Sequence, residues 1–294
     1  MSLDLCILAS GSAGNCSVVR SPRGVLLIDG GLGPRSIDQR LREAGTGVRI
    51  DDVAGVCLTH LDRDHLSSNF VTWLGRRGIP VFCHADKVHD LHAMAGRQTV
   101  TLRNVHAFGN DTFEPIDGLK VDPVPLAHDA EGCHGFILTV RERRPGTAAR
   151  RIGFATDLGR VPPELVDRFC ADGGLDVLAI ESNYCPQMQL ASPRPPFLKT
   201  RIMGGRGHLS NLQAFAAVRQ TLDRHQALDL ELPGNIVLLH RSRDCNCPDR
   251  VREVFAGDKR AAARLVLAEQ TEPTGWLRRR IGAAPAKQMT FAWG

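Results

Sequence analysis

Two histidines and two aspartates directly follow an apolar run in the stretch Val53-Ala54-Gly55-Val56-Cys57-Leu58-Thr59-His60-Leu61-Asp62-Arg63-Asp64-His65. The apolar run predicts a buried strand, so this cluster differs from a charged surface turn, which would be polar on both flanks. Side chains alternate in an extended loop, so His60, Asp62 and Asp64 project to one side, and His65 turns away at the start of a predicted helix. Imidazole and carboxylate bind divalent metals. One short loop can therefore supply ligands to two metal ions.

The other ligands of a two-metal site are expected where further strands end. His128 follows the segment 121–127, Asp157 follows 152–156, and His240 follows 236–239. Because each comes one step after an apolar strand, all three are predicted to lie on one rim of a sheet sandwich, where Asp157 could bridge two cations. The predicted metal ligands are His60, Asp62, Asp64, His65, His128, Asp157 and His240.

The pattern of apolar segments predicts one large mixed α/β (α+β) domain covering residues 1–294, with sheets at its centre and helices packed outside. Strands are predicted at about 3–9, 16–20, 25–29, 53–59, 80–84, 119–126, 135–141, 151–156, 176–181 and 235–239. Helices are predicted at about 34–44, 66–77, 86–95, 162–170, 211–225 and 248–256.

Two further stretches have the composition of loops. Residues 141–151 contain Pro145-Gly146 and predict the tip of a hairpin. Residues 182–207 are rich in Pro, Gly and Arg, and a long loop beside a metal site is a candidate substrate lid. Its basic residues either hold a polyanion or form a solvated surface; they are Arg194, Lys199, Arg201 and Arg206.

His208 is predicted to be a catalytic residue because of its place in Gly207-His208-Leu209-Ser210-Asn211, just before a predicted helix. Free N–H groups at a helix start, together with a hydroxyl and a histidine, suit an anion. Arg206, Ser210 and Asn211 are the predicted substrate-binding residues, although Ser210 or Asn211 could equally cap the helix. The remaining histidines are predicted to be structural or surface residues, with His134 a possible support for the ligands; they are His84, His89, His92, His106, His134 and His225.

Composition sets broad limits on the class of protein. The chain has 294 residues, of which 43% are hydrophobic, and no apolar stretch approaches the roughly 20 residues that span a bilayer. The N-terminus lacks the basic and apolar regions of a secretion signal, so a cytoplasmic location without membrane contact is expected. The net charge of +5 comes mostly from arginine and gives weak support for a nucleic-acid partner.

Cysteine usage indicates reduced thiols rather than a disulfide framework. Nine cysteines are an odd number, and those in strand-like runs are expected to be small buried hydrophobes. Cys245 and Cys247, with Cys185, could hold a structural metal, but a loop of reduced thiols is the favoured interpretation.

The segment from Thr59 to His65 resembles the T-H-x-H-x-D-H signature of the metallo-β-lactamase superfamily. Asp29 resembles that family's early aspartate, which supports the metal loop. The likeness to the bacterial YycJ/WalJ-type branch extends over Leu8-Ala9-Ser10-Gly11-Ser12-Ala13-Gly14-Asn15, Glu181-Ser182-Asn183 and His240-x-Ser242. The resemblance implies a four-layer αββα sandwich with a dinuclear site at the sheet rim. It also implies nuclease-like chemistry similar to ribonuclease Z, where a histidine corresponding to His208 assists at the scissile phosphate.

Two positions depart from the family's pattern. Asp62 stands where most members carry histidine, and an aspartate there also resembles the competence-type DNA-uptake hydrolases. The extra carboxylate makes the first site harder, which shifts the preference from zinc toward manganese or iron and puts its full occupancy in question. Tyr184-Cys185 replaces a usual His-Asp pair, which would alter the substrate pocket.

Three functional hypotheses follow. The leading one is a metal-dependent phosphodiesterase or nuclease that acts on DNA or RNA through water activated by two divalent ions, which could be zinc, manganese or iron. Asp64 would orient that water or accept its proton, and His208 would protonate the leaving oxygen. The alternatives are a small-molecule hydrolase acting on a cyclic nucleotide, phosphodiester or lactone, and an inactive metal-binding regulatory domain.

Overall fold

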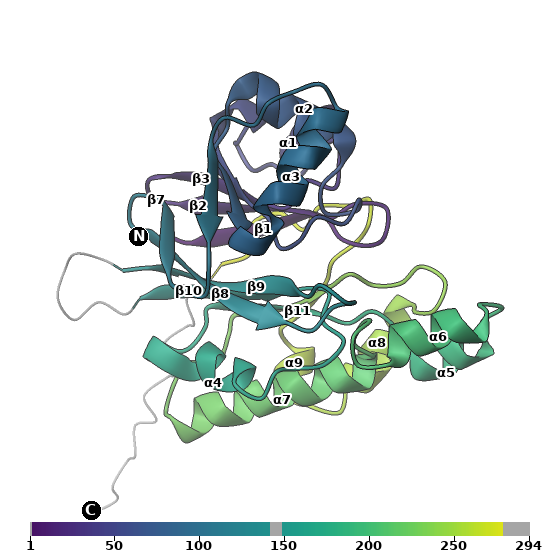
Figure 1. The fold of residues 1–294 in the computed structure, drawn as a ribbon. Coiled ribbons are helices and arrows are strands. Elements are labelled where there is room, and N and C mark those ends of the chain that lie inside the picture. The colour runs from purple at the N-terminus through teal and green to yellow at the C-terminus, as the bar shows by residue number, and fades with distance from the viewer. Residues whose placement is uncertain (1, 142–148, 279–294) are drawn as a thin grey trace, which may run out of the picture.

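Two β-sheets packed face to face form the centre of the computed structural model, which describes residues 2–141 and 149–278 (Figure 1). The first sheet has the strand order β1 (Asp4–Ala9), β2 (Cys16–Ser21), β3 (Gly24–Ile28), β4 (Val53–Cys57), β5 (Val81–His84) and β6 (Val105–Phe108). The second has the order β13 (Leu265–Leu267), β12 (Asn235–Leu239), β11 (Val177–Glu181), β10 (Arg150–Ala155), β9 (Cys133–Val140), β8 (Leu119–Leu126) and β7 (Phe113–Ile116).

Helices cover the outer face of each sheet (Figure 1). The first sheet is covered by α1 (Pro34–Glu43), α2 (Ser68–Arg77) and α3 (Val88–Arg97). The second is covered by α4 (Leu165–Cys170), α7 (Asn211–Ala227), α8 (Pro248–Phe255) and α9 (Lys259–Ala262), and α5 (Pro186–Ala191) and α6 (Pro196–Met203) lie together at one end of that layer. Short 3-10 turns cover Ile50–Asp52, Ala85–Lys87 and Ala171–Gly173. The predicted four-layer αββα arrangement is confirmed.

Burial on both faces explains the continuous apolar runs in the central strands. Leu26, Phe136 and Val237 pack between the two sheets. Neighbouring residues on the same strands face the helices, so every residue of β12 is buried. Burial on both faces produces unbroken apolar segments instead of an alternation of apolar and polar residues. For this reason the sequence shows these strands as short apolar runs.

Several elements differ from the sequence-based predictions. The strands β6, β7 and β13 were not predicted, because they have only four, four and three residues, too few to show a strand pattern in the sequence. The segment 182–207, predicted as a loop, contains α5 and α6. The predicted hairpin tip falls on residues 142–148, outside the described residues, between β9 and β10. None of the helices in the described part combines the length and apolar character needed to cross a bilayer.

Strand direction brings the ends of four strands to one edge of the second sheet. β10, β11 and β12 are mutually parallel, and β8 points the same way because β9 is antiparallel to both β8 and β10. The first sheet adds β3 and β4, which are also parallel to each other. Residues that follow these strands are therefore gathered at a common rim, as in other sheets with parallel strands.

Candidate metal centre

The loop after β4 forms a tight turn that exposes its polar side chains toward the second sheet. The N–H groups of His65 and Leu66 both donate to the Asp62 carbonyl, at 2.8 Å each. The helix α2 begins three residues later, where the Ser67 hydroxyl accepts from the N–H of Phe70 and caps it. The turn therefore separates Asp62 from His65 and allows the loop to face two positions at once.

A left-handed backbone marks three of the residues that follow strands. Asp29, Asp157 and His240 have φ angles of 62°, 50° and 50°. Non-glycine residues rarely adopt this conformation, which costs free energy and occurs where the surrounding structure enforces it, often at functional sites. Asp29 and His240 directly follow β3 and β12, and Asp157 lies two residues after β10. Asp157 and His240 belong to the candidate clusters at the rim, and Asp29 contacts His65 of one cluster.

The first candidate metal position is formed by His60, Asp62 and His128. The Asp62 Oδ2 atom lies 3.7 Å from His60 Nε2 and 3.9 Å from His128 Nε2. His128 Nδ1 lies 3.1 Å from the Gly207 carbonyl, so Nε2 is the nitrogen that faces Asp62. The Asp62 side chain is 55% exposed, which makes this the more open of the two positions.

The second candidate position is formed by Asp64, His65 and His240. Asp64 Oδ2 lies 3.7 Å from His65 Nε2 and 3.5 Å from His240 Nε2. Asp29 orients His65 from behind: its Oδ2 lies 2.7 Å from His65 Nδ1, and its Oδ1 accepts from the Thr59 N–H at 2.8 Å. A carboxylate behind a ligating imidazole fixes the ring and raises its basicity.

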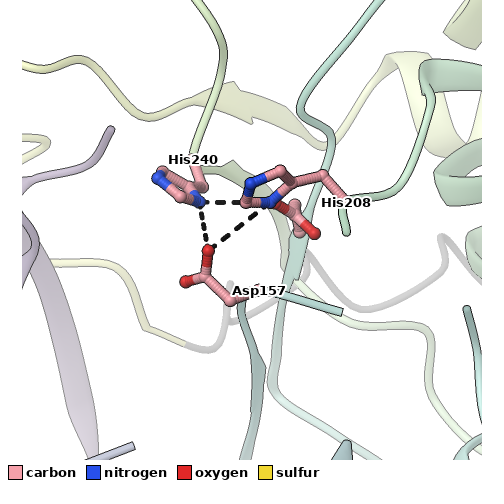
Figure 2. Close-up of side chains that lie close together, drawn as sticks. Asp157, His208 and His240 are labelled. Atoms are coloured by element: carbon pink, nitrogen blue, oxygen red, sulfur yellow. Dashed lines mark hydrogen bonds and ion pairs between the residues drawn. The ribbon is translucent and has the colours of Figure 1, made fainter. Parts of the chain in front are cut away.

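Asp157 joins the two positions. It belongs both to a cluster with His60 and His65 and to a cluster that includes His240. Its Oδ2 atom lies 2.9 Å from His65 Nε2, and its Oδ1 atom lies 2.6 Å from His240 Nδ1. Figure 2 shows Asp157, His208 and His240 pointing toward one another. The structure thus brings together all seven predicted metal ligands and His208.

Glu181 is a site residue that the sequence analysis quoted only as part of a motif. It is fully buried at the end of β11, and its Oε1 atom lies 2.6 Å from His208 Nδ1. Its Oε2 atom accepts from the N–H groups of Leu158 and Leu209, at 2.9 and 3.2 Å. Its position after an apolar strand, like that of Asp157, was the signal that could have identified it.

Burial and neighbouring charges shift the pKa values of this cluster in different directions. Burial acts to lower the pKa of His65, but the charges of Asp157 and Asp29 outweigh it and raise that pKa to about 10. Burial, reinforced by His65, lowers the pKa of His60 to about 3. Burial would raise the pKa of Asp157, yet the charges of His240 and His65 hold it well below its usual range. Protons therefore balance the carboxylates in the metal-free protein, and a cation that binds must displace them.

The residues present fit divalent cations. His60 Nε2 and both ring nitrogens of His240 are buried without a hydrogen-bond partner, and the 2.6 Å approach of His240 Nδ1 to Asp157 is not aligned as a hydrogen bond. Buried nitrogens left unpaired are costly unless they bind something. A set of imidazoles and carboxylates suits zinc, manganese or iron. The clusters could therefore hold metal, and His60, Asp62, His128, Asp64, His65, His240 and Asp157 are the residues that would do so.

Six of the seven candidate ligands, all but His65, line a cleft of about 290 Å³, which α6 and Arg194 wall on one side. It is called the catalytic cleft below because it holds the candidate catalytic residues Asp64 and His208. Arg194 and Arg201 reach this cleft, but each makes an ion pair, with Asp244 and Asp129 respectively. Lys199 donates to the carbonyl of Leu190. Most of the basic residues predicted to hold a polyanion are therefore engaged within the protein.

The predicted substrate-binding residues are not on the cleft wall. Arg206 is exposed outside it. The Ser210 hydroxyl caps α7 by accepting from the N–H of Gln213, so the capping alternative is the one observed. Asn211 is buried and bonds to Ser182 and Asn246. Substrate binding by these three residues stays a prediction, and in this arrangement their side chains do not line the catalytic cleft.

The other polar residues considered from the sequence lie outside the clusters. His134 stacks on His84, with ring centroids 4.3 Å apart. All nine cysteines are free, and within the described residues none belongs to a group that could hold a metal. The favoured interpretation of Cys185, Cys245 and Cys247 as reduced thiols is consistent with this arrangement.

Comparison with known proteins agrees with the geometry. Residues 9–178 match the model of a family described as "Metallo-beta-lactamase superfamily". The chain is 25% identical over 253 residues to "Exodeoxyribonuclease YycJ" of Bacillus anthracis, covering 86% of this chain and 87% of the relative. It is 25% identical over 217 residues to "Exodeoxyribonuclease WalJ" of Streptococcus pneumoniae serotype 2 (strain D39 / NCTC 7466), covering 74% and 76%.

Solved structures share the fold. The metallo-beta-lactamase fold protein YhfI from Bacillus subtilis superposes with a TM-score of 0.63 at 14% identity, covering 93% of this chain and 99% of that one. Yeast PDE1 has a TM-score of 0.61 at 12% identity, with the same coverage. A diphosphatase from the PhnP family has a TM-score of 0.59 at 15% identity, covering 95% and 99%.

Proposed function

Because the chain belongs to the metallo-beta-lactamase superfamily and has its hydrolase fold, we propose that it is a metal-dependent phosphodiesterase that cleaves nucleic acid. DNA is the first substrate to test, since the two curated relatives carry the name exodeoxyribonuclease. The neighbours named as a diphosphatase and as PDE1 share only the fold, but their names are compatible with chemistry at phosphorus.

The observation that carries the proposal is the pair formed by Glu181 and His208 beside Asp157. Glu181 holds His208 Nδ1 at 2.6 Å, and the same nitrogen lies 3.5 Å from Asp157 Oδ1. Nε2 is thereby left as the nitrogen that can serve a substrate in the cleft. Hydrolysis of a phosphodiester needs an acid for its leaving oxygen, which a ligand set alone does not provide.

The roles of the protein groups follow from their positions. When bound, divalent cations would acidify a water nucleophile and stabilise charge on the phosphate. Asp64 is one-quarter exposed at the mouth of the second position, so its carboxylate can orient that water or accept its proton. His208, held by Glu181, donates a proton to the leaving oxygen. The segment 182–207, with α5 and α6, acts as a lid that excludes bulk water from the catalytic cleft.

The ligand chemistry supports two ions that are bound with unequal affinity. Asp64, His65, His240 and Asp157 form a mostly buried position, while Asp62 leaves the first position half open. A carboxylate in place of an imidazole favours the harder ions manganese and iron over zinc.

Elemental analysis of the purified protein, combined with hydrolysis of labelled single- and double-stranded DNA and RNA in the presence of manganese, tests the proposal. We expect at least one bound equivalent of a divalent transition metal and cleavage of DNA. His208→Ala should reduce turnover by about a hundredfold or more while metal content stays unchanged. Loss of metal in this variant would instead make His208 a ligand, and absence of cleavage of every phosphodiester would refute the proposal.

A small phosphodiester is the second candidate substrate. It is favoured by the ion pairs of Arg194 and Arg201, which reduce the charge available to a polyanion. The two candidates differ in salt dependence: polynucleotide affinity should fall steeply as salt rises, whereas the KM of a small diester should hardly change.

A further inference from the structure

We propose that a second cleft beside Asp64 binds an additional phosphate of the substrate, next to the one that is hydrolysed. This cleft, of about 480 Å³, is called the Arg63 cleft here and is lined by Ser12, Gly31, Gly33, Arg63, Asp64 and Asn69, among others. The inference rests on the proposed function, because it extends the phosphodiester site to a substrate that carries more than one phosphate.

The Arg63 cleft is continuous with the catalytic cleft. Ser12 and Asp64 line both of them. Asp64 is a candidate ligand of the second metal position, so a substrate whose scissile phosphate lies there would reach the Arg63 cleft with its neighbouring phosphate. A mononucleotide diester would leave this cleft empty, and a strand of nucleic acid would fill it.

Charge favours an anion in this cleft. Arg63 is exposed and, among the described residues, makes no hydrogen bond or ion pair. A guanidinium fork matches two phosphate oxygens. Helix α1 begins at the cleft with no acidic residue in its first turn and no side-chain cap at Gly33, which adds positive potential. Asp64 is the one carboxylate on the wall, and its charge would be offset by a bound cation.

The cleft on the opposite side of the centre is much less suited to a polyanion. It lies beside α3, and its wall carries three cations, Lys87, Arg97 and Arg201, against four carboxylates. Lys87 and Arg201 pair with Glu131 and Asp129, which leaves Arg97 as the cation without an ion pair among the described residues. Asp62 and Asp90 are the other two carboxylates, so the acidic groups outnumber the basic ones on that wall, whereas Arg63 faces a single carboxylate in its own cleft. The contrast between the two clefts gives the substrate strand a direction, from the catalytic cleft past Ser12 toward Arg63.

The backbone around the Arg63 cleft is held in place before any substrate binds. The N–H of Asn15 donates to the Asp64 carbonyl at 2.6 Å, and the N–H of Gly31 donates to the Asn15 carbonyl at 2.9 Å. A Cβ atom on Gly31 would lie 1.8 Å from the Asp64 carbonyl oxygen, so only glycine allows this approach. Because these walls are already fixed, less conformational entropy is lost when a ligand binds, which favours binding in this cleft.

The test measures binding of a fluorescent phosphorothioate decathymidylate, which resists cleavage, to the metal-loaded protein at several salt concentrations. Arg63→Gln should weaken Kd about tenfold and reduce the slope of log affinity against log salt by about 0.7, as for one lost phosphate contact on a single strand. The matched control is Arg97→Gln, an arginine of the opposite cleft on α3, which should leave both values unchanged. Equal losses in the two variants, or none in Arg63→Gln, would overturn the inference.

Two further measurements keep this result separate from the proposed function. Hydrolysis of bis(4-nitrophenyl) phosphate by the wild-type protein tests the phosphodiesterase alone; if it is cleaved while Arg63→Gln binds normally, only the second phosphate site is refuted. Because Arg63 stands between two candidate ligands, metal content is measured in each variant. If Arg63→Gln loses metal, Arg63→Lys is measured instead. Lysine keeps the charge but lacks the guanidinium fork, so binding should weaken two- to fivefold, and an unchanged Kd would overturn the inference.

Discussion

The two sheets contribute to the candidate metal centre in opposite ways, and the residues that each sheet contributes are called its share. The first sheet contributes one loop after β4, and this loop carries His60, Asp62, Asp64 and His65 within six positions. The second sheet contributes a single residue from the end of each of four strands, namely His128, Asp157, Glu181 and His240.

The difference lies in what holds each share in place. The loop is fixed by local contacts, such as the hydrogen bonds from His65 and Leu66 to Asp62, and by Asp29 behind it. The residues of the second sheet are fixed by strand register over long sequence separations. A loop can lose one ligand and keep its turn, whereas the second share depends on the packing of the whole sheet. Asp157 touches both shares, so the comparison can be tested there first.

The largest effect is expected for Asp157→Asn. This change removes the charge that faces both His65 and His240 but preserves the shape of the side chain and its backbone conformation. We expect activity on DNA to fall by about a thousandfold and the bound metal to drop at both positions, as measured by elemental analysis. Asp167→Asn, an exposed aspartate paired with Arg224, is the control and should change neither value. Full metal content in Asp157→Asn would show that the two shares do not depend on this residue.

Glu181→Gln tests the second sheet alone. The neutral amide should weaken the hold on His208, so kcat should fall about tenfold to a hundredfold while metal content is kept. The double variant with His208→Ala should be no slower than His208→Ala itself, because the two residues act as one unit. If the two losses of kcat add in the double variant, Glu181 has a role that does not depend on His208.

Removal of metal should affect stability as well as activity. With the cations extracted by a chelator, Tm should fall by several degrees, because a ligand that binds only the folded state stabilises it by mass action. Asp29→Asn, which loosens His65 in the loop share, should reduce this metal-dependent gain in Tm relative to the wild-type protein. Thermal unfolding with and without manganese measures both effects, and an identical gain in the variant would contradict the role given to Asp29.

Asp62→His tests how the loop after β4 sets the metal preference of the first position. An imidazole should tighten zinc at the first position about tenfold relative to manganese, with no loss of the second position. Competition between the two ions, followed by elemental analysis, measures this preference. An unchanged ratio of the metals would mean that Asp62 is not a ligand.

The smallest effect concerns Ser210, once predicted to bind substrate. Ser210→Ala removes the cap of α7 and should cost about 1 kcal/mol of unfolding free energy with no change in KM for DNA. Denaturant unfolding measures the stability and steady-state kinetics measures KM, and a raised KM would support substrate binding by Ser210.

These contrasts also explain what could be predicted from the sequence. The candidate ligands of the loop could be predicted because they are close together in the chain. His128, Asp157 and His240 could be predicted because each follows an apolar strand. Glu181 obeys the same rule, but its partner His208 comes from another loop, and a sequence gives no measure of that distance. The direction of the Ser210 and Asn211 side chains, which turn into the protein, could not be read from the sequence, because only coordinates show it. The helices α5 and α6 were hidden by a composition typical of loops.

The left-handed backbone at Asp29, Asp157 and His240 limits how this centre can change over generations. Aspartate, asparagine and histidine tolerate that conformation better than most residues, and glycine tolerates it best, whereas β-branched residues are strongly disfavoured there. A copy of this chain that drifted away from hydrolysis would therefore retain its architecture most easily through asparagine or glycine at these three positions. Descendants that had lost the chemistry would then be recognisable by those two residues in place of the acids and the imidazole.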